Sequence, residues 1–282
     1  MLRRSAAAFA LLTVAGAACD PAAAQDFEPR LTFAPPSADR TVALTFDACS
    51  GGFDRRVMDA LVQSNAKATI FVTERWLKRN AAALAEIKAR PDLFEIENHG
   101  QNHIPAVTDV PTMFGLKTAG TIEAVRAEIE NGAKAVEAAT GARPRWYRGA
   151  TARYSRDALE LSNSLGMAVA GYSLNADMGA SLPAASVAKR MAAARSGDVV
   201  IAHINQPDRS AGQGVAEGVR ALAASGVRFV RLDEARTKSD DGAPIVTAKK
   251  KPAVPASAAP KAETPAAIPA SAPAGGTFVS RP

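Results

Sequence analysis

The chain alternates short, strand-like apolar runs with longer helix-like segments, and this order constrains its fold more than any other feature. The predicted strands cover residues 41–46, 68–72, 93–96, 145–147, 167–172, 199–202 and 227–230. The predicted helices cover residues 53–65, 81–89, 122–139, 156–165, 183–194 and 215–224. Repeated βα order is typical of a parallel sheet, open or closed into a barrel, so the sequence predicts an α/β fold.

The first residues are typical of a secretory signal peptide. A short basic start precedes the small and apolar residues 5–18, and Ala22–Ala24 supply a cleavage site. The apolar run is too short to cross a membrane, so we predict a signal peptide over residues 1–24, no transmembrane span, and an exported protein, periplasmic or secreted. Lipidation of Cys19 is the alternative, which we favour less because Gly16 stands where Leu or Val is usual.

The end of the chain, residues 237–282, is rich in Ala, Pro and Lys. Such a segment buries little apolar surface, so we predict a disordered tail. It holds six Lys or Arg against three Asp or Glu, which accounts for much of the formal net charge of +6. We therefore expect no nucleic-acid partner; the tail either contacts an anionic cell-envelope surface or is a plain spacer. A linker over residues 25–40 and a single catalytic domain over residues 41–236 complete the predicted organisation.

All three histidines of the chain lie close behind predicted strands. His99 and His103 follow residues 93–96, and His203 follows residues 199–202. Side chains four apart on one helical turn lie about 5–6 Å apart at Cβ, so this pair can hold one cation. Without further context, two surface histidines on one turn are the competing interpretation.

Three charged side chains also follow predicted strands. Asp47 follows the first strand, Arg148 the fourth and Asp177 the fifth. The carboxyl ends of parallel strands meet at one edge of a sheet, so we expect these residues to converge there with the histidines. An acid, a cation and several imidazoles at one edge predict a metal-dependent hydrolytic site.

The same segments resemble, in the same order, the motifs of the polysaccharide deacetylases of carbohydrate esterase family 4, also called the NodB-homology domain. The segments that carry the resemblance are residues 42–47, 68–72, 98–103, 145–148, 172–177, 199–203 and 227–232. The resemblance covers nearly all of residues 41–232. It implies a single-domain, distorted (β/α) barrel with about seven parallel strands.

The resemblance also implies a reaction. Family members remove acetyl groups from N-acetylated sugars with a divalent metal, usually bound by Asp-His-His. By position, His99 and His103 would hold the metal, for which we expect Zn2+, and Asp47 would be the base. His203 would be the acid that protonates the departing amine.

Two further residues are assigned supporting roles by position. Arg148 would orient Asp47 and stabilise its charge, and Asp177 would favour the protonated form of His203. Other interpretations stay open: Asp47 can simply end a strand and cap a turn, and Arg148 can be a surface cation. Asn175 lies near the position where the family often has an acid, and so competes with Asp177.

The chain departs from the family at Ala48, which stands where the second of two consecutive aspartates usually binds the metal. Asp47 can replace that ligand, Cys49 can donate a thiolate, or water and substrate can complete the metal site. A lone cysteine is more often a small buried apolar residue than a ligand. The loop over residues 101–119 is expected to shape the substrate groove.

The leading functional hypothesis is a deacetylase whose partner is an N-acetylated glycan, chitin-like or peptidoglycan. A catalytically weak or inactive glycan-binding relative of the same fold is the alternative. The three histidines together favour the enzyme, because a binding module needs no general acid.

Overall fold

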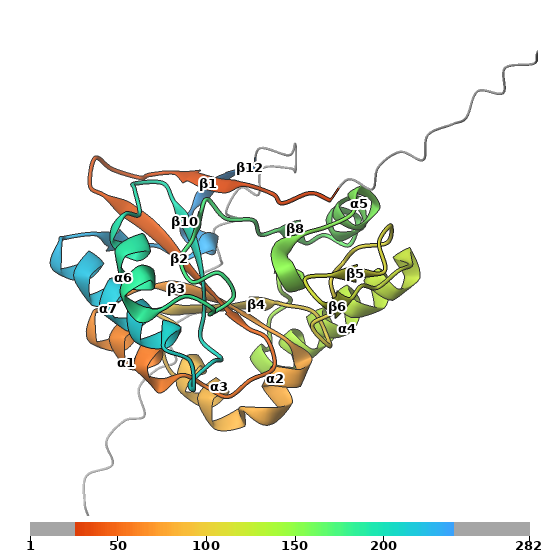
Figure 1. Cartoon of the computed structure of the whole chain (residues 1–282), viewed down its shortest axis with the longest axis horizontal. Helices are drawn as coiled ribbons and strands as arrows, with labels where there is room; N and C mark the ends of the chain where they lie inside the picture. Colours follow the sequence, from red (N-terminus) through yellow and green to blue (C-terminus); the bar gives the residue numbers. More distant parts are fainter. Residues whose placement is uncertain (1–25, 240–282) are drawn as a thin grey trace, which may run out of the picture. The chain divides into compact units, whose positions relative to one another are not determined.

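The computed structural model describes residues 26–239. Its main sheet holds eight parallel strands and curls into an open half-barrel (Figure 1). Seven of them follow the order β8 (Ala168–Val169), β7 (Trp146–Tyr147), β4 (Phe94–Asn98), β3 (Ala68–Val72), β2 (Thr41–Ala48), β10 (Val199–His203) and β9 (Leu174–Asn175). The eighth, β11 (Arg228–Phe229), pairs with the first residues of β2. The predicted distorted barrel of about seven parallel strands is confirmed, and β9 is the strand that the sequence did not indicate.

Seven α-helices accompany the sheet in the described part of the chain. They are α1 (Arg55–Gln63), α2 (Glu74–Arg79), α3 (Ala81–Lys88), α4 (Ile122–Thr140), α5 (Arg156–Ser164), α6 (Ala184–Ala192) and α7 (Ala211–Ala224). The prediction missed α2, whose six residues are too few to show a helical period. It also began α7 four residues too late, because Gly212 and Gly214 weaken the helical pattern there. Gly214 is required by packing, since a Cβ at this position would lie 2.2 Å from the carbonyl oxygen of Ala184 on α6.

The two faces of β2 have different surroundings. Every second residue from Val42 to Ala48 belongs to the large apolar core that includes residues of α1 and α7. Thr45, which lies on the other face, accepts a hydrogen bond from Arg148 inside the barrel. Because successive strand residues point to opposite faces, Asp47 is directed to the barrel interior and Ala48 to the helix side.

Ordered structure extends on both sides of the predicted domain 41–236. Strand β1 (Leu31–Ala34) pairs antiparallel with β12 (Arg236–Ser239). The predicted linker over residues 25–40 contains β1, and the predicted disordered tail from residue 237 contains all but the first residue of β12, so neither strand was predicted. The predicted signal peptide, Cys19 and most of the predicted tail lie outside the described residues. Within residues 26–239, none of the helices combines the length and apolar character needed to cross a membrane.

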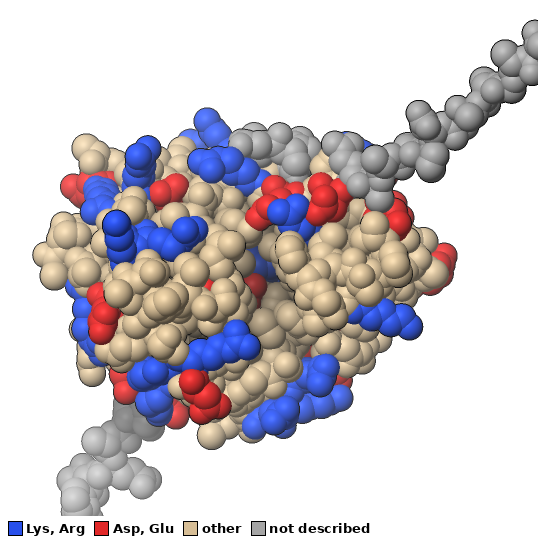
Figure 2. Space-filling model, viewed as in Figure 1, with Lys and Arg blue, Asp and Glu red and all other residues tan. Residues whose placement is uncertain are grey.

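The predicted substrate-groove loop, residues 101–119, contains a small hairpin. Its strands are β5 (Thr112–Met113) and β6 (Leu116–Lys117), joined by Phe114 and Gly115, both with positive φ. Phe114 is 75% exposed. On the face drawn in Figure 2, basic side chains are scattered among acidic and uncharged ones and form no continuous patch over the described residues.

Candidate active site and metal centre

The carboxyl ends of the parallel strands bring the predicted residues together. Asp47 on β2 and His203 on β10 are register partners. His99 follows β4, and its Nε2 lies 3.7 Å from Asp47 Oδ2. Arg148 follows β7 and reaches the same carboxylate from the other side. The convergence expected from a parallel sheet is therefore present.

Arg148 is fully buried and every part of its guanidinium is used. Nη1 donates to Asp47 Oδ1 at 3.0 Å and to Thr45 Oγ1 at 2.9 Å. Nε donates to the carbonyl of Ala170 at 3.0 Å, and Nη2 donates to the carbonyl of Gly171 at 3.1 Å. Arg148 is thus not a surface cation, and it holds the Asp47 carboxylate in one orientation, as the resemblance implied.

Asp47 is a buried carboxylate surrounded by positive charge. Burial by itself raises the pKa of Asp47, but the charges of His99, Arg148 and His203 and the hydrogen bond from Arg148 bring that pKa below its usual value. The carboxylate is therefore ionised at neutral pH and can accept a proton.

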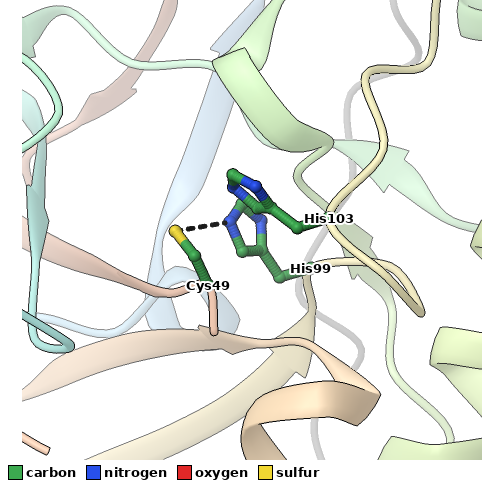
Figure 3. A group of neighbouring side chains, drawn as sticks. All are labelled: Cys49, His99 and His103. Atoms are coloured by element: carbon green, nitrogen blue, oxygen red, sulfur yellow. Dashed lines mark hydrogen bonds between the residues drawn. The ribbon is translucent and has the colours of Figure 1, made fainter. Parts of the chain in front are cut away.

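His99 is oriented by a backbone contact. Its Nδ1 lies 2.6 Å from the carbonyl oxygen of Arg148. A carbonyl can only accept, so Nδ1 carries a proton and Nε2 is the nitrogen that is directed to the site and available to a metal. Nε2 lies 3.5 Å from Cys49 Sγ, and the ring of His103 lies 5.0 Å from the ring of His99. Figure 3 shows the thiol and both imidazoles facing one another.

The expectation that His99 and His103 share a helical turn was wrong. The segment after His99 is an irregular loop in which Gly100 has φ 86° and His103 has φ 61°. The loop is shaped by Glu128 on α4, whose Oε1 accepts hydrogen bonds from the N–H groups of Asn102 at 2.8 Å and Ile104 at 3.1 Å. A Cβ at position 100 would lie 2.5 Å from the same carboxylate oxygen, so the loop requires glycine there.

Glu128 is a positioning residue that the sequence did not reveal. Its side chain is charged and lies in the middle of α4, yet the residue is only 3% exposed. Burial raises its pKa, and the hydrogen bonds from the loop oppose that shift. A carboxylate in the middle of a helix is normally read as solvent-exposed, so only the position of α4 against the loop identifies its role.

His203 is held by Asp177. The Nδ1 of His203 lies 3.0 Å from Asp177 Oδ1, and its backbone N–H donates to Asp177 Oδ2 at 2.7 Å. Burial lowers the pKa of His203, but the charge and hydrogen bond of Asp177, with a smaller contribution from Cys49, raise it well above its usual value. The competing residue Asn175 instead accepts a hydrogen bond from the N–H of Met178 at 2.8 Å. The acid beside His203 is therefore Asp177.

Cys49 lies at the centre of the three histidines. It is 7% exposed. Burial raises the pKa of its thiol, but the charge of His99 and hydrogen bonds with His103, His203 and His99 bring that pKa well below its usual value. Within residues 26–239, the only group of at least three His, Cys, Asp or Glu side chains with ligand atoms within 4.8 Å of one another is Cys49, His99 and His103. This donor set fits a divalent metal with an affinity for nitrogen and sulfur.

Comparison with known proteins places this site in a family. The sequence model of the polysaccharide deacetylase family matches residues 34–170, which contain Asp47, Cys49, His99, His103 and Arg148. No curated protein matches the chain in sequence.

Three solved structures share the fold at low sequence identity. The peptidoglycan deacetylase PdaC from Bacillus subtilis is 21% identical, with a TM-score of 0.57 over 70% of this chain and 90% of that one. The peptidoglycan N-acetylglucosamine deacetylase Bc1960 is 20% identical, with a TM-score of 0.59 over 72% and 90%. A carbohydrate esterase family 4 pseudoenzyme from Bacillus anthracis is 20% identical, with a TM-score of 0.56 over 70% and 65%. Residues 34–170 therefore match the polysaccharide deacetylase family, and the predicted motifs in this part of the chain stand in their expected order.

Proposed function

We propose that this protein is a metal-dependent hydrolase that removes acetyl groups from the N-acetylated sugars of a polysaccharide, chitin-like or peptidoglycan. The observation that carries the proposal is a pair of proton-transfer groups, Asp47 and His203, at the ends of two neighbouring strands. Asp47 is an ionised carboxylate paired with Arg148, and His203 is an imidazole paired with Asp177. Two of the similar structures are named as peptidoglycan deacetylases, which supports the substrate class.

The site has residues suited to a divalent metal, for which we propose Zn2+. His99 and His103 would hold it, with Asp47 or Cys49 as a third protein ligand. When bound, such an ion polarises the amide carbonyl of the substrate and lowers the pKa of a coordinated water. The contact between His99 Nδ1 and the carbonyl of Arg148 is the kind of outer contact that orients a ligating imidazole.

Asp47 would remove the proton from the attacking water. Its charge is maintained by Arg148, which also prevents the carboxylate from rotating. A base must be ionised before the reaction starts, and the lowered pKa of Asp47 meets that requirement at neutral pH.

His203 would donate a proton to the departing amine. The raised pKa of His203 keeps the imidazole protonated at neutral pH, because Asp177 stabilises the positive charge. Nδ1 is engaged by Asp177, so the proton for the amine would come from Nε2. A base and an acid whose pKa values are displaced in opposite directions are the expected pair for hydrolysis of an amide.

A second candidate function is that of a weakly active or inactive glycan-binding relative. Ala48 favours it, because this residue supplies no metal ligand where the family usually has an aspartate. One of the similar structures is named as a pseudoenzyme of the same carbohydrate esterase family.

Acetate release separates the two functions. The mature chain, without a histidine tag and loaded with zinc, would be assayed on N-acetylglucosamine oligomers, peptidoglycan and O-acetylated xylan, with Asp47→Asn as the matched control. We expect release from the first or second substrate, and a loss of about 10²–10⁴-fold in the control. Metal-loaded protein that binds the glycans but releases no acetate would instead establish the second function.

We also propose that the protein is exported to the periplasm or secreted, on the basis of residues 1–24. Fractionation of cells expressing the full chain tests this. Unprocessed protein confined to the cytoplasm would contradict it.

A further inference from the structure

We propose that Cys49 is the third protein ligand of the metal, so that the centre is Cys49, His99 and His103 and the Asp47 carboxylate stays off the metal. This inference rests on the proposed function only in that a metal binds at all. Metal binding can be measured without turnover, so the two proposals can fail separately.

The geometry of the three side chains is close to that of a tetrahedral site. Their ligand atoms all lie within 4.8 Å of one another, and Cys49 Sγ is 3.5 Å from His99 Nε2. Bonds of about 2.3 Å to sulfur and about 2.0–2.1 Å to nitrogen place the ligand atoms of tetrahedral zinc roughly 3.5 Å apart. A small rotation of side chains would therefore bring all three atoms onto one ion.

Asp47 is less suited to this position. Its Oδ1 accepts a hydrogen bond from Arg148 at 3.0 Å. A metal ion bound to Oδ2 would share the carboxylate with this guanidinium, and the two positive charges would repel each other. In the described residues, Asp47 is not a member of the group whose ligand atoms lie within 4.8 Å. Ala48 offers no alternative, because its side chain belongs to the apolar core on the helix side of the sheet.

The backbone of Cys49 is held from both sides, as a ligand requires. The hydroxyl of Thr73 donates to the Cys49 carbonyl. With the Asn205 amide oriented to satisfy both of its neighbours, Nδ2 donates to the carbonyl of Asp47 at 3.1 Å and Oδ1 accepts from the Cys49 N–H at 3.3 Å. Gly51 permits this arrangement, since a Cβ there would lie 2.1 Å from the carbonyl oxygen of Asn205.

The donor set has a consequence for metal choice. A thiolate is a soft ligand that favours Zn2+ and Co2+, whereas an aspartate in the same place is a hard ligand that tolerates Mn2+ and Mg2+. The chain should therefore select zinc or cobalt over manganese more strongly than an Asp-His-His centre does. Replacement of the usual aspartate by Ala48 is then compensated one residue later in the sequence.

Cobalt titration of the apoprotein tests this inference directly. Co2+ bound to a thiolate gives an intense near-ultraviolet charge-transfer band, and Co2+ bound only to nitrogen and oxygen does not. We expect the mature, untagged wild type to bind one equivalent of Co2+ with this band. Cys49→Ala should lose the band and at least about 100-fold in affinity, more than is typical for loss of an outer contact.

Cys49→Asp is the second variant and keeps the test valid if the alanine variant fails to fold. It should lose the band, retain metal binding, and shift its preference from Co2+ towards Mn2+. Wild type that binds Co2+ without the band, or Cys49→Ala that binds with unchanged affinity, would overturn the inference. A wild type with the band but without acetate release would support the thiolate ligand and reject only the deacetylase. A wild type that binds no metal would reject both.

Discussion

Two groups of buried carboxylates lie on the inner face of the same parallel sheet, and they are neutralised in different ways. At the carboxyl end, Asp47 faces the fully buried Arg148 at 3.0 Å. On β4, Glu95 and Glu97 are two residues apart on one face, and their nearest cation is Arg145, which is 36% exposed and 3.5 Å from Glu95. The first carboxylate is stabilised as an anion, and the other two have no equivalent partner.

The pKa shifts follow from this difference. Burial raises the pKa of Glu95, and the charge of Asp233 adds to the effect. Burial and the charge of Glu95 raise the pKa of Glu97 well above its usual value, although Glu97 accepts the N–H groups of Arg145 and Trp146. The β4 pair therefore retains a proton at a pH where Asp47 has lost its own. Burial in one barrel interior thus leads to opposite protonation states, because Asp47 is surrounded by the charges of His99, Arg148 and His203 and the β4 pair has no comparable set of cations.

The largest expected effect concerns the metal ligands. His99→Ala and His103→Ala should each abolish metal binding and activity, because the remaining two protein ligands make a poor site for a dication. Elemental analysis of the untagged proteins measures the metal, and circular dichroism checks the fold. Full metal occupancy in either single variant would remove that histidine from the site.

His203→Ala should keep the metal and lose most of the rate. An acid that only protonates the leaving amine contributes about 10²–10⁴-fold without acting on the bound ion. Acetate release and metal content measured on the same preparation test this. If the metal is lost as well, His203 is a ligand and the separation of acid from metal shell is wrong.

The arginines provide the most direct comparison of the two regions. Arg148→Met should cost about 3–5 kcal/mol of unfolding free energy, because the Asp47 carboxylate remains buried without its cation. Arg145→Met, the matched control, should cost less than about 1 kcal/mol, because this ion pair is partly exposed. Urea unfolding of both variants at neutral pH measures the difference. Equal losses would mean that burial of Arg148 has no special electrostatic role.

Ala48→Asp should destabilise the fold and not improve the metal site. Ala48 is fully buried in the apolar core, so the new carboxylate would lie among apolar side chains at a cost of at least about 1–3 kcal/mol. Zinc titration and thermal unfolding of wild type and variant measure both effects. Tighter zinc binding with an intact fold would instead place this side chain in the metal shell.

The smallest effect is expected in the β4 pair. Glu97 has a folded-state pKa above its unfolded value, so between the two values the folded state binds more protons and stability falls as pH rises. Glu97→Gln removes this loss and keeps an acceptor for both N–H groups. Its unfolding free energy relative to wild type should therefore increase by about 1 kcal/mol from about pH 5 to about pH 8, or roughly 2–4 °C in Tm.

The exposed Glu160→Gln is the control for the β4 experiment, since a carboxylate on the surface of α5 should show no such trend. A Glu97→Gln variant that becomes relatively less stable with rising pH would reverse the assigned direction of the shift.

Local pattern was sufficient for most of the architecture. Apolar runs of period two and helical segments between them identified seven of the eight strands in the parallel sheet and six of the seven helices in the described chain. In those two sets it missed α2 and β9, which are short: α2 begins with the N-cap Thr73 but has too few residues to show a helical period, and β9 has only two residues. The rule that parallel strands end at one edge was enough to gather Asp47, Arg148 and His203, because each directly follows or ends a strand.

The details of the site depended on contacts that no local pattern contains. Glu128 on α4 shapes the loop that carries His103, and it is distant in sequence from both histidines. The amide of Asn205, a residue near the end of the domain's sequence, accepts a hydrogen bond from the backbone N–H of Cys49. Sequence thus determined which chemical groups reach the edge of the sheet, since strand order and motif spacing are local properties. The tertiary structure decided that a thiol and not Ala48 faces the imidazoles, because helices pack against the face of β2 that carries Ala48 and leave the opposite face as the barrel interior.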